Sequence, residues 1–351
     1  MSSLKYNLAC LGIVSQVLLN CLFLSDNDLI VKPIKRYTDS AVKEEVLHSK
    51  EFNEMRDESP TTLKISDEDL ICKDPGMAFD KADESLEKIL DYEREEIKRI
   101  PILLFHDVGC HEKSAYSERY VVSPENFREQ LHFLYSKNYV PISIDEYLKD
   151  DLSYVPKGKK PVILTFDDAT KGQLFYYEDG QVDSRSAVGI MNDFSKKHCD
   201  WRKRAVFFID FVDKDGLFQV PFEQKGKEDD KISYLLEEGY EVNNHTFFHH
   251  NIDKITYNDL VNDIKTFNYF MKDFDLKNEN TLALPYGSFP GSDKKWQFLD
   301  KKFDFYFAAY AKTVDKRAHR VGSKGFDNRY IPRIEVPPDC IPSLKRYIEG
   351  Y

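Results

Sequence analysis

Two adjacent carboxylates, Asp167 and Asp168, directly follow the apolar run Pro161-Val162-Ile163-Leu164-Thr165-Phe166, which is typical of a buried strand. Carboxylates at the end of such a strand are costly to bury unless they bind something. Successive residues point in different directions, so one carboxylate could bind a cation while the other faces a substrate. The alternative is a loop in which two solvated aspartates cap the next helix.

Three of the nine histidines lie close together in the run His245-Thr246-Phe247-Phe248-His249-His250. The spacing of His245 and His249 predicts that both imidazoles lie on one face of a helical turn, within reach of one metal ion. Two histidines and one carboxylate form a complete protein ligand set for a metal that keeps open positions for water and substrate. His250 competes with His249 for this role, and a cluster of surface histidines is the alternative interpretation.

A third motif, Leu284-Pro285-Tyr286-Gly287, ends another apolar strand with a turn whose glycine lets the backbone approach a ligand closely. By itself it is compatible with an ordinary turn.

Two other kinds of metal enzyme are disfavoured. The HTFFH run lacks the glutamate of the HExxH metalloproteases, and no HxD or HxE of an iron oxygenase occurs in a suitable strand.

The elements that would position these motifs alternate between strand and helix patterns. Ser123 suits the N-cap of a helix, and Pro124 suits its first position. Such alternation is typical of a parallel α/β sheet, open or closed, and in a parallel barrel the carboxyl ends of the strands form the active-site face. The apolar runs predict strands at about 101–106, 140–144, 161–166, 205–209, 240–242, 281–284, 305–309 and 331–334.

In this order, the motifs resemble those of the polysaccharide deacetylases of the NodB-homology group, carbohydrate esterase family 4. The family motif TFDD is present as Thr165-Phe166-Asp167-Asp168, and H-[ST]-x-x-H is present as His245-Thr246-Phe247-Phe248-His249. The third, R-x-P-[FY]-G, is present in part as Ala283-Leu284-Pro285-Tyr286-Gly287. The resemblance covers about 101–340 and implies a distorted or incomplete (β/α) barrel.

One branch of the family, the circularly permuted poly-N-acetylglucosamine deacetylases, is more similar still, because its catalytic-acid histidine lies on the first strand. Leu103-Leu104-Phe105-His106-Asp107-Val108 resembles that strand. Two departures stand out. Ala169 replaces the usual glycine, and Ala283 replaces the arginine that holds the catalytic aspartate in many members. Arg333 could reach the same place from a neighbouring strand end, although it could also be a surface charge.

The resemblance implies a division of labour among these residues. Asp168, His245 and His249 would bind a divalent metal, with zinc preferred over cobalt or nickel, and Asp167 would be the general base. His106 would protonate the leaving amine, or else be a buried structural histidine. The oxyanion and substrate would meet the turn at Pro285 and Tyr286, where the Tyr286 backbone N–H is the expected donor. Arg333 would orient the base.

The expected activity is therefore metal-dependent hydrolysis of N-acetyl groups on a polysaccharide that contains N-acetylglucosamine. An alternative is an impaired deacetylase-fold protein that acts as a glycan-binding or scaffold module, and the changes at Ala169 and Ala283 motivate it. The net charge of −11 gives no electrostatic help in binding phosphate backbones, so nucleic acid is not an expected partner. The partner is instead an acetylated polysaccharide.

The remaining sequence divides into two parts. Residues 8–24 are mostly apolar, so we expect 1–24 to be a signal anchor, with a cleaved signal peptide, lipidation at Cys21 and a buried core helix as alternatives. Residues 25–100 hold 21 acidic and 13 basic residues and predict a charged stalk with a helix near 79–98. Residues 101–351 would be the catalytic domain. The anchor, the cleaved signal peptide and the lipidation at Cys21 each predict an extracytoplasmic protein, anchored to the membrane or secreted.

Overall fold

The computed structural model describes residues 97–109, 120–213, 215–277, 279–309, 317–338, 344–345 and 348. The predicted anchor at 1–24 and the charged stalk at 25–100 therefore lie outside the described residues, except for 97–100. Residues 97 and 98 are not helical, and Arg99–Ile100 form strand β1. Within the described part of the chain, no helix is long and apolar enough to cross a membrane.

Seven parallel strands close into a barrel, which confirms the predicted (β/α) fold class. Parallel pairing runs in the order β2–β6–β7–β8–β9–β10–β12 and returns from β12 to β2. The barrel is irregular, because β8 and β9 pair at a single position, Asn244 opposite Leu282. The strands are β2 (Ile102–Phe105), β6 (Lys160–Asp167), β7 (Val206–Ile209), β8 (Glu241–Asn244), β9 (Thr281–Ala283), β10 (Phe305–Ala309) and β12 (Ile331–Glu335).

Among the described residues, five short strands lie outside the ring. Strand β5 (Tyr139–Pro141) pairs with the first half of β6, before β6 meets β2. The predicted strand over 140–144 is therefore too long, because Ser143 caps a helix that begins at Ile144. Strand β1 pairs with β11 (Ala318–His319), and β3 (Asp107–Val108) pairs with β4 (Val121–Val122).

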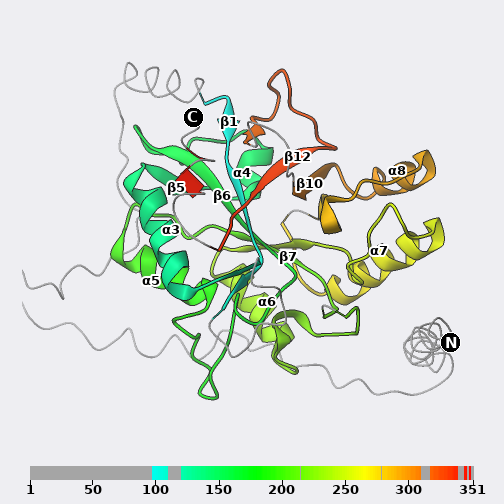
Figure 1. Ribbon diagram of the computed structural model, residues 1–351, viewed down its shortest axis with the longest axis horizontal. Helices are drawn as coiled ribbons and strands as arrows, with labels where there is room; N and C mark the ends of the chain where they lie inside the picture. The colour runs from blue at the N-terminus through cyan, green and yellow to red at the C-terminus, as the bar shows by residue number, and fades with distance from the viewer. Residues whose placement is uncertain are drawn as a thin grey trace, which may run out of the picture. The chain divides into compact units, whose positions relative to one another are not determined.

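Helices cover the outside of the barrel. Helix α3 packs beside α5, and α7 packs beside α8 on another side (Figure 1). The hydroxyl of Ser123 accepts a hydrogen bond from the N–H of Asn126, which confirms the predicted N-cap of α3. The helices are α3 (Pro124–Ser136), α4 (Ile144–Leu148), α5 (Ala187–Lys197), α6 (Glu228–Glu237), α7 (Tyr257–Met271) and α8 (Asp293–Leu299), with single 3-10 turns at η2 (Pro221–Glu223) and η3 (Pro285–Gly287).

Alternate residues of each barrel strand serve two different cores. The rings of Phe208 and Phe307 lie 5.5 Å apart although their strands, β7 and β10, are not neighbours, so this pair fills the barrel interior. Phe207, one residue away, instead stacks on Phe166 in the layer beneath the helices. Because side chains alternate along a strand, the residue that follows Phe166 points back into the barrel mouth. That residue is Asp167.

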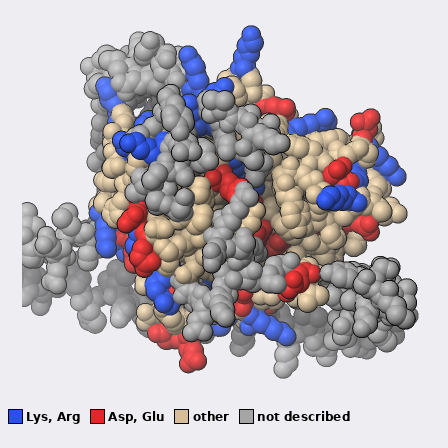
Figure 2. All heavy atoms as spheres, in the orientation of Figure 1, with Lys and Arg blue, Asp and Glu red and all other residues tan. Residues whose placement is uncertain are grey.

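The surface carries both signs of charge. In the face that Figure 2 draws, Lys and Arg side chains are interspersed with Asp and Glu side chains across the described residues. The net charge of −11 is therefore not gathered into one acidic field on this face.

Candidate active site

The strand register brings the polar motifs together at the carboxyl end of the barrel. Phe105 of β2 pairs with Phe166 of β6, so His106 and Asp167 occupy the next positions on adjacent strands. In the same way Ile209 pairs with Asn244, so Asp210 and His245 follow side by side on β7 and β8. Residues far apart in sequence thus meet at one edge.

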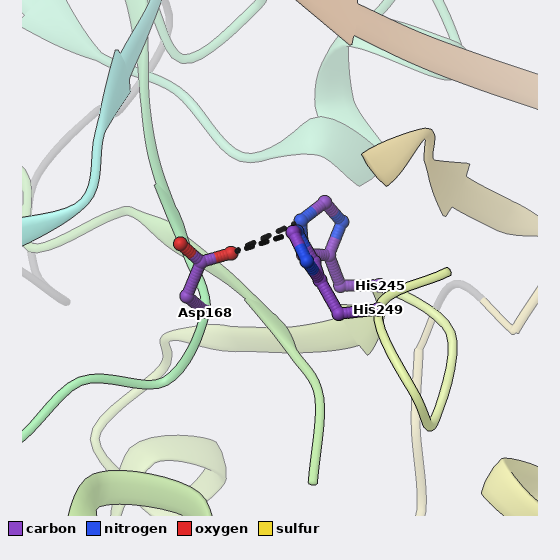
Figure 3. Close-up of side chains that lie close together, drawn as sticks. All are labelled: Asp168, His245 and His249. Carbon is purple, nitrogen blue, oxygen red and sulfur yellow. Dashed lines mark ion pairs between the residues drawn. The ribbon is translucent and has the colours of Figure 1, made fainter. Parts of the chain in front are cut away.

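Asp168, His245 and His249 converge on one point (Figure 3). The Oδ1 atom of Asp168 lies 3.3 Å from the Nε2 atom of each histidine, and the possible ligand atoms all lie within 4.8 Å of one another. Oδ1 is buried, and no hydrogen bond reaches it. A buried carboxylate oxygen that faces two imidazole nitrogens fits a divalent cation, because these are the ligand types of zinc sites with open positions.

The histidine motif is a loop and not a helical turn, so that part of the sequence prediction is wrong. Thr246 and His249 have φ angles of 64° and 48°, and a right-handed helix cannot contain such residues. Buried Asp263 of α7 holds the loop by accepting hydrogen bonds from the N–H groups of Phe247 and Phe248. The short approach of the two imidazoles therefore depends on a bend in the backbone.

His250 does not face the cation site. Its Nδ1 atom lies 3.0 Å from Oδ2 of Asp263, so its ring is bound on the side of α7. His249 is the histidine that points at Asp168, and its ring lies over that of Tyr286, with ring centroids 4.6 Å apart. The structure thus separates the two competing histidines.

Ala283 fixes the orientation of His245. Nδ1 of His245 lies 3.0 Å from the carbonyl oxygen of Ala283, and a carbonyl can only accept, so Nδ1 carries the hydrogen. Nε2 is then the nitrogen that faces Asp168, and a histidine whose Nδ1 is hydrogen-bonded in this way is oriented to bind a metal through Nε2. The position where related motifs carry arginine thus contributes its backbone here.

Arg333 binds the base predicted from sequence. Its Nη1 and Nη2 atoms donate to the two carboxylate oxygens of Asp167 at 2.6 and 2.7 Å, and both side chains are buried. Arg333 is therefore not a surface charge. It also does not come from a neighbouring strand, because β2 lies between β12 and β6, and the side chain reaches across the barrel mouth. Its guanidinium lies 5.2 Å from the ring centroid of Phe208 below.

Charge and burial compete at each of these groups. Burial by itself would raise the pKa of Asp167, but Arg333 and His245 outweigh it and lower that pKa. Burial would likewise raise the pKa of Asp168, and the neighbouring histidines lower it. Burial lowers the pKa of His249 to about 4, so this imidazole is neutral near pH 7. Both carboxylates are therefore ionised and available as base or ligand.

The site opens into a cavity of about 390 Å³ that brings all but one of the predicted site residues together. The exception is Pro285, which precedes Tyr286 in the chain and is buried without lining the cavity. Tyr286 is 69% exposed at the mouth, with a φ angle of 57°. The predicted residues that line the cavity are His106, Asp167, Asp168, His245, His249, Tyr286 and Arg333.

Sequence reasoning missed two site residues. Asp210 is buried, lines the cavity, and has a pKa raised well above its usual value, mainly by burial and then by Asp168. It directly follows the apolar run of β7, so the same strand-end rule that selected Asp167 would have found it. Asp263 lies within α7, and no local pattern marks it as the residue that holds the histidine loop.

Ala169, one residue beyond Asp168, adopts a left-handed conformation with a φ angle of 43° and is buried. A non-glycine residue there is strained, which explains why related motifs carry glycine at this position. The carbonyl of Ala169 accepts a hydrogen bond of 2.6 Å from the N–H of Phe222, which helps to hold the turn. The methyl group therefore costs conformational energy without displacing Asp168 from the two histidines.

Comparison with known proteins agrees with this site. Residues 154–302 match the family model described as polysaccharide deacetylase. The deacetylase PplD of Streptococcus pyogenes, in complex with acetate, is similar in structure, with a TM-score of 0.52 and 19% identity over 72% of this chain and 99% of that one. BC0361, a polysaccharide deacetylase from Bacillus cereus, gives a TM-score of 0.51 and 18% identity over 71% of this chain and 68% of that one. At such low identity the two structures show the fold alone. A search of curated proteins finds no match.

The barrel and its polar mouth define an α/β-barrel hydrolase site. Residues 154–302 thus form a region similar to the polysaccharide deacetylases, and the family match spans all three motifs. His106 and Arg333 lie outside the matched residues, and the fold brings both to the same cavity.

Proposed function

We propose that the protein is a metal-dependent N-deacetylase of a polysaccharide that contains N-acetylglucosamine. The observation that carries this proposal is the convergence of Asp168, His245 and His249 beside the Arg333-bound carboxylate of Asp167. The site has a ligand set and a separate ionised base, which are the two groups that amide hydrolysis by activated water requires.

Asp168, His245 and His249 would hold the metal, and zinc is our first choice because of the mixed nitrogen and oxygen donors. When bound, the metal lowers the pKa of a water molecule and polarises the acetamide carbonyl. Asp167 takes a proton from that water. Arg333 keeps Asp167 ionised and directs its carboxylate, since the paired hydrogen bonds fix the carboxylate plane.

His106 follows β2, the strand that pairs with β6, and lines the same cavity as Asp167. Its ring lies 4.7 Å from that of Tyr120. We assign to it the protonation of the leaving amine, because an amine leaves poorly as an anion and an imidazolium can donate the proton that it needs. The exposed ring of Tyr286 at the cavity mouth, next to Pro285, is placed to contact the sugar, and the backbone N–H of Tyr286 would support the oxyanion.

We also propose that the protein acts outside the cytoplasm, attached through its N-terminal segment or secreted. Two features support this. Residues 8–24 are mostly apolar, and Cys199 is disulfide-bonded. Disulfides persist mainly in oxidising compartments. Nothing in the site favours the alternative of an impaired glycan-binding module, because Ala169 and Ala283 leave the cluster intact.

The experiment that tests the activity is acetate release from a panel of poly-N-acetylglucosamine, chitooligosaccharide, peptidoglycan and acetylxylan. We expect acetate from one or more N-acetylated glycans, little from the O-acetylated xylan, loss with a chelator and recovery with zinc. Absence of acetate from every N-acetylated glycan, with zinc bound at one ion per chain, would contradict the proposal.

A further inference from the structure

Gln173 lies in the loop after β6 and contacts both groups to which proton transfer is assigned above. Its side chain is fully buried, and its Nε2 atom donates to the carbonyl oxygens of His106 and of Asp167, each at 2.6 Å. A side-chain amide has two N–H bonds on one nitrogen, so it can serve both carbonyls at once. The β2–β6 ladder has its last paired positions at Phe105 and Phe166, so Gln173 links the two strands one residue beyond it.

The same loop contacts β3, the short strand that follows β2, at a second point. Oδ1 of buried Asp107 accepts hydrogen bonds from Oγ1 of Thr170 at 2.8 Å and from the N–H of Gly172 at 3.2 Å. A Cβ atom on Gly172 would lie 1.9 Å from the carbonyl oxygen of Val108, so only glycine allows this approach. We call Thr170, Gly172 and Gln173, with the backbone they hold, the clasp.

The chemistry of Gln173 indicates why this residue is present. Its Oε1 atom is buried and has no hydrogen-bond partner. An unpaired buried acceptor is destabilising, so the two donors of the side chain, and not its acceptor, account for a glutamine at this position. Leucine would fill the space without donating, and an ionised glutamate would place a negative charge against two carbonyl oxygens.

We propose that Gln173 is a positioning residue that holds the proton donor His106 and the base Asp167 at a fixed separation. This inference rests on the proposed deacetylase function. The two groups must face the substrate carbon from different strands, and a misplacement of about 1 Å can lower the rate by roughly 10²-fold. Arg333 fixes the carboxylate end of Asp167, whereas Gln173 fixes its backbone and that of His106 together.

The test compares Gln173→Leu with Gln130→Leu. Gln130 is a matched control, because it is also fully buried on α3, its Oε1 is also unpartnered, and its Nε2 donates only to the carbonyl of Pro337 at 3.4 Å. We expect Gln173→Leu to lower kcat by roughly 10–10²-fold with unchanged KM and metal content. Gln130→Leu should lower the melting temperature and keep kcat. Equal kcat in the two variants would overturn the proposal.

A double-mutant cycle separates positioning from mere stability. If Gln173 acts through the proton-transfer pair, Gln173→Leu should cost much less in the His106→Ala background than in the wild type. Losses in kcat that multiply fully would contradict it. Should Gln173→Leu fail to fold, Thr170→Val loosens the clasp more gently by removing the hydroxyl that binds Asp107, and the same smaller, coupled loss in kcat is expected.

Hydrogen exchange gives a readout that does not depend on activity. The amides of residues 106–108 and 167–170 should exchange faster in Gln173→Leu, or in Thr170→Val, than in Gln130→Leu and the wild type. If wild-type protein releases no acetate, the proposed function fails, but the exchange rates still test whether the clasp holds the two segments. Unchanged exchange at both segments would overturn the positioning role of Gln173, whether or not the protein is active.

Discussion

Both ends of the barrel bury carboxylates, but the two ends satisfy them differently. At the amino end, Glu241 at the start of β8 accepts backbone N–H hydrogen bonds from Ile144 at 2.7 Å and Asp145 at 3.1 Å, where helix α4 begins. At the carboxyl end, Oδ1 of Asp168 accepts no hydrogen bond and faces two imidazoles across a cavity. Burial alone therefore does not mark a functional carboxylate.

The two carboxylates, Glu241 and Asp168, differ in the groups that surround them. Backbone N–H groups at a helix start are fixed parts of the fold, so Glu241 is part of the structure and has no need of a ligand. Imidazole nitrogens that converge with a carboxylate are typical metal ligands, and the space between them can hold a metal ion. The pKa values follow: burial raises the pKa of Glu241 to about 7, whereas the histidines lower that of Asp168 despite its burial.

The largest expected effect is that of Asp168→Asn. Loss of the carboxylate should remove the bound metal and all measurable acetate release, because an amide is a weak ligand. Metal analysis of the purified variant measures this directly. His250→Ala is the control within the histidine loop and should keep both metal and activity, since its ring binds Asp263. A variant at His250 that loses metal, beside a His249→Ala variant that keeps it, would reverse our assignment.

His106→Ala should have the next largest effect. We expect metal to remain bound and kcat to fall by roughly 10²–10⁴-fold, the usual contribution of a positioned acid. The melting temperature, measured on the same preparation, should change little. Near-normal kcat with a lower melting temperature would make His106 a structural residue, like the groups at the amino end.

Arg333→Met tests the buried ion pair. Removing the guanidinium leaves Asp167 buried without its partner, so we expect a loss of about 3–5 kcal/mol in the free energy of unfolding. Urea denaturation measures it. The loss should shrink when Asp167→Asn is added, because no unpaired carboxylate then remains. An unchanged loss in the double variant would show that packing of Arg333, and not its charge, matters.

Glu241→Gln should have the smallest effect, confined to stability. The pKa of Glu241 rises from 4.5 unfolded to about 7 folded, so between these pH values the folded state binds more protons. The wild type therefore loses stability as pH rises from about 4.5 to 7, by at most about 1.4 kcal/mol per pH unit. The glutamine variant should lack this dependence and keep kcat. Parallel stability curves for the two proteins would contradict this account.

The sequence predicted the barrel strands and most site residues because strand ends carry local signals. An apolar run followed by carboxylates or histidines can be recognised without any tertiary information, as at Asp167 and His245. What could not be predicted depends on long-range geometry. The positive φ angles at Thr246 and His249 lie in a loop that Asp263 of α7 binds through backbone N–H groups, and helical spacing was therefore a misleading guide.

The roles of Arg333 and Gln173 also depend on long-range geometry, and the sequence predicted the first in part and the second not at all. The sequence suggested that Arg333 could replace a missing motif arginine, yet only the strand order reveals that it reaches across β2 to Asp167. Gln173 carries no local signal at all. Its role depends on two backbone carbonyls, and any sequence could have supplied those. A residue that binds another side chain can be predicted from the two residue types. A residue that binds backbone groups can be found only in the three-dimensional structure.

The most direct test of the central claim is kcat and metal content measured on one preparation of Asp167→Asn. The claim is that one aspartate of the pair binds metal and the other moves a proton. The account predicts one metal ion per chain, as in the wild type, and a kcat lower by roughly 10²–10⁴-fold, because the amide cannot accept the proton of water. Near-normal kcat, or loss of the metal, would contradict the division between Asp167 and Asp168.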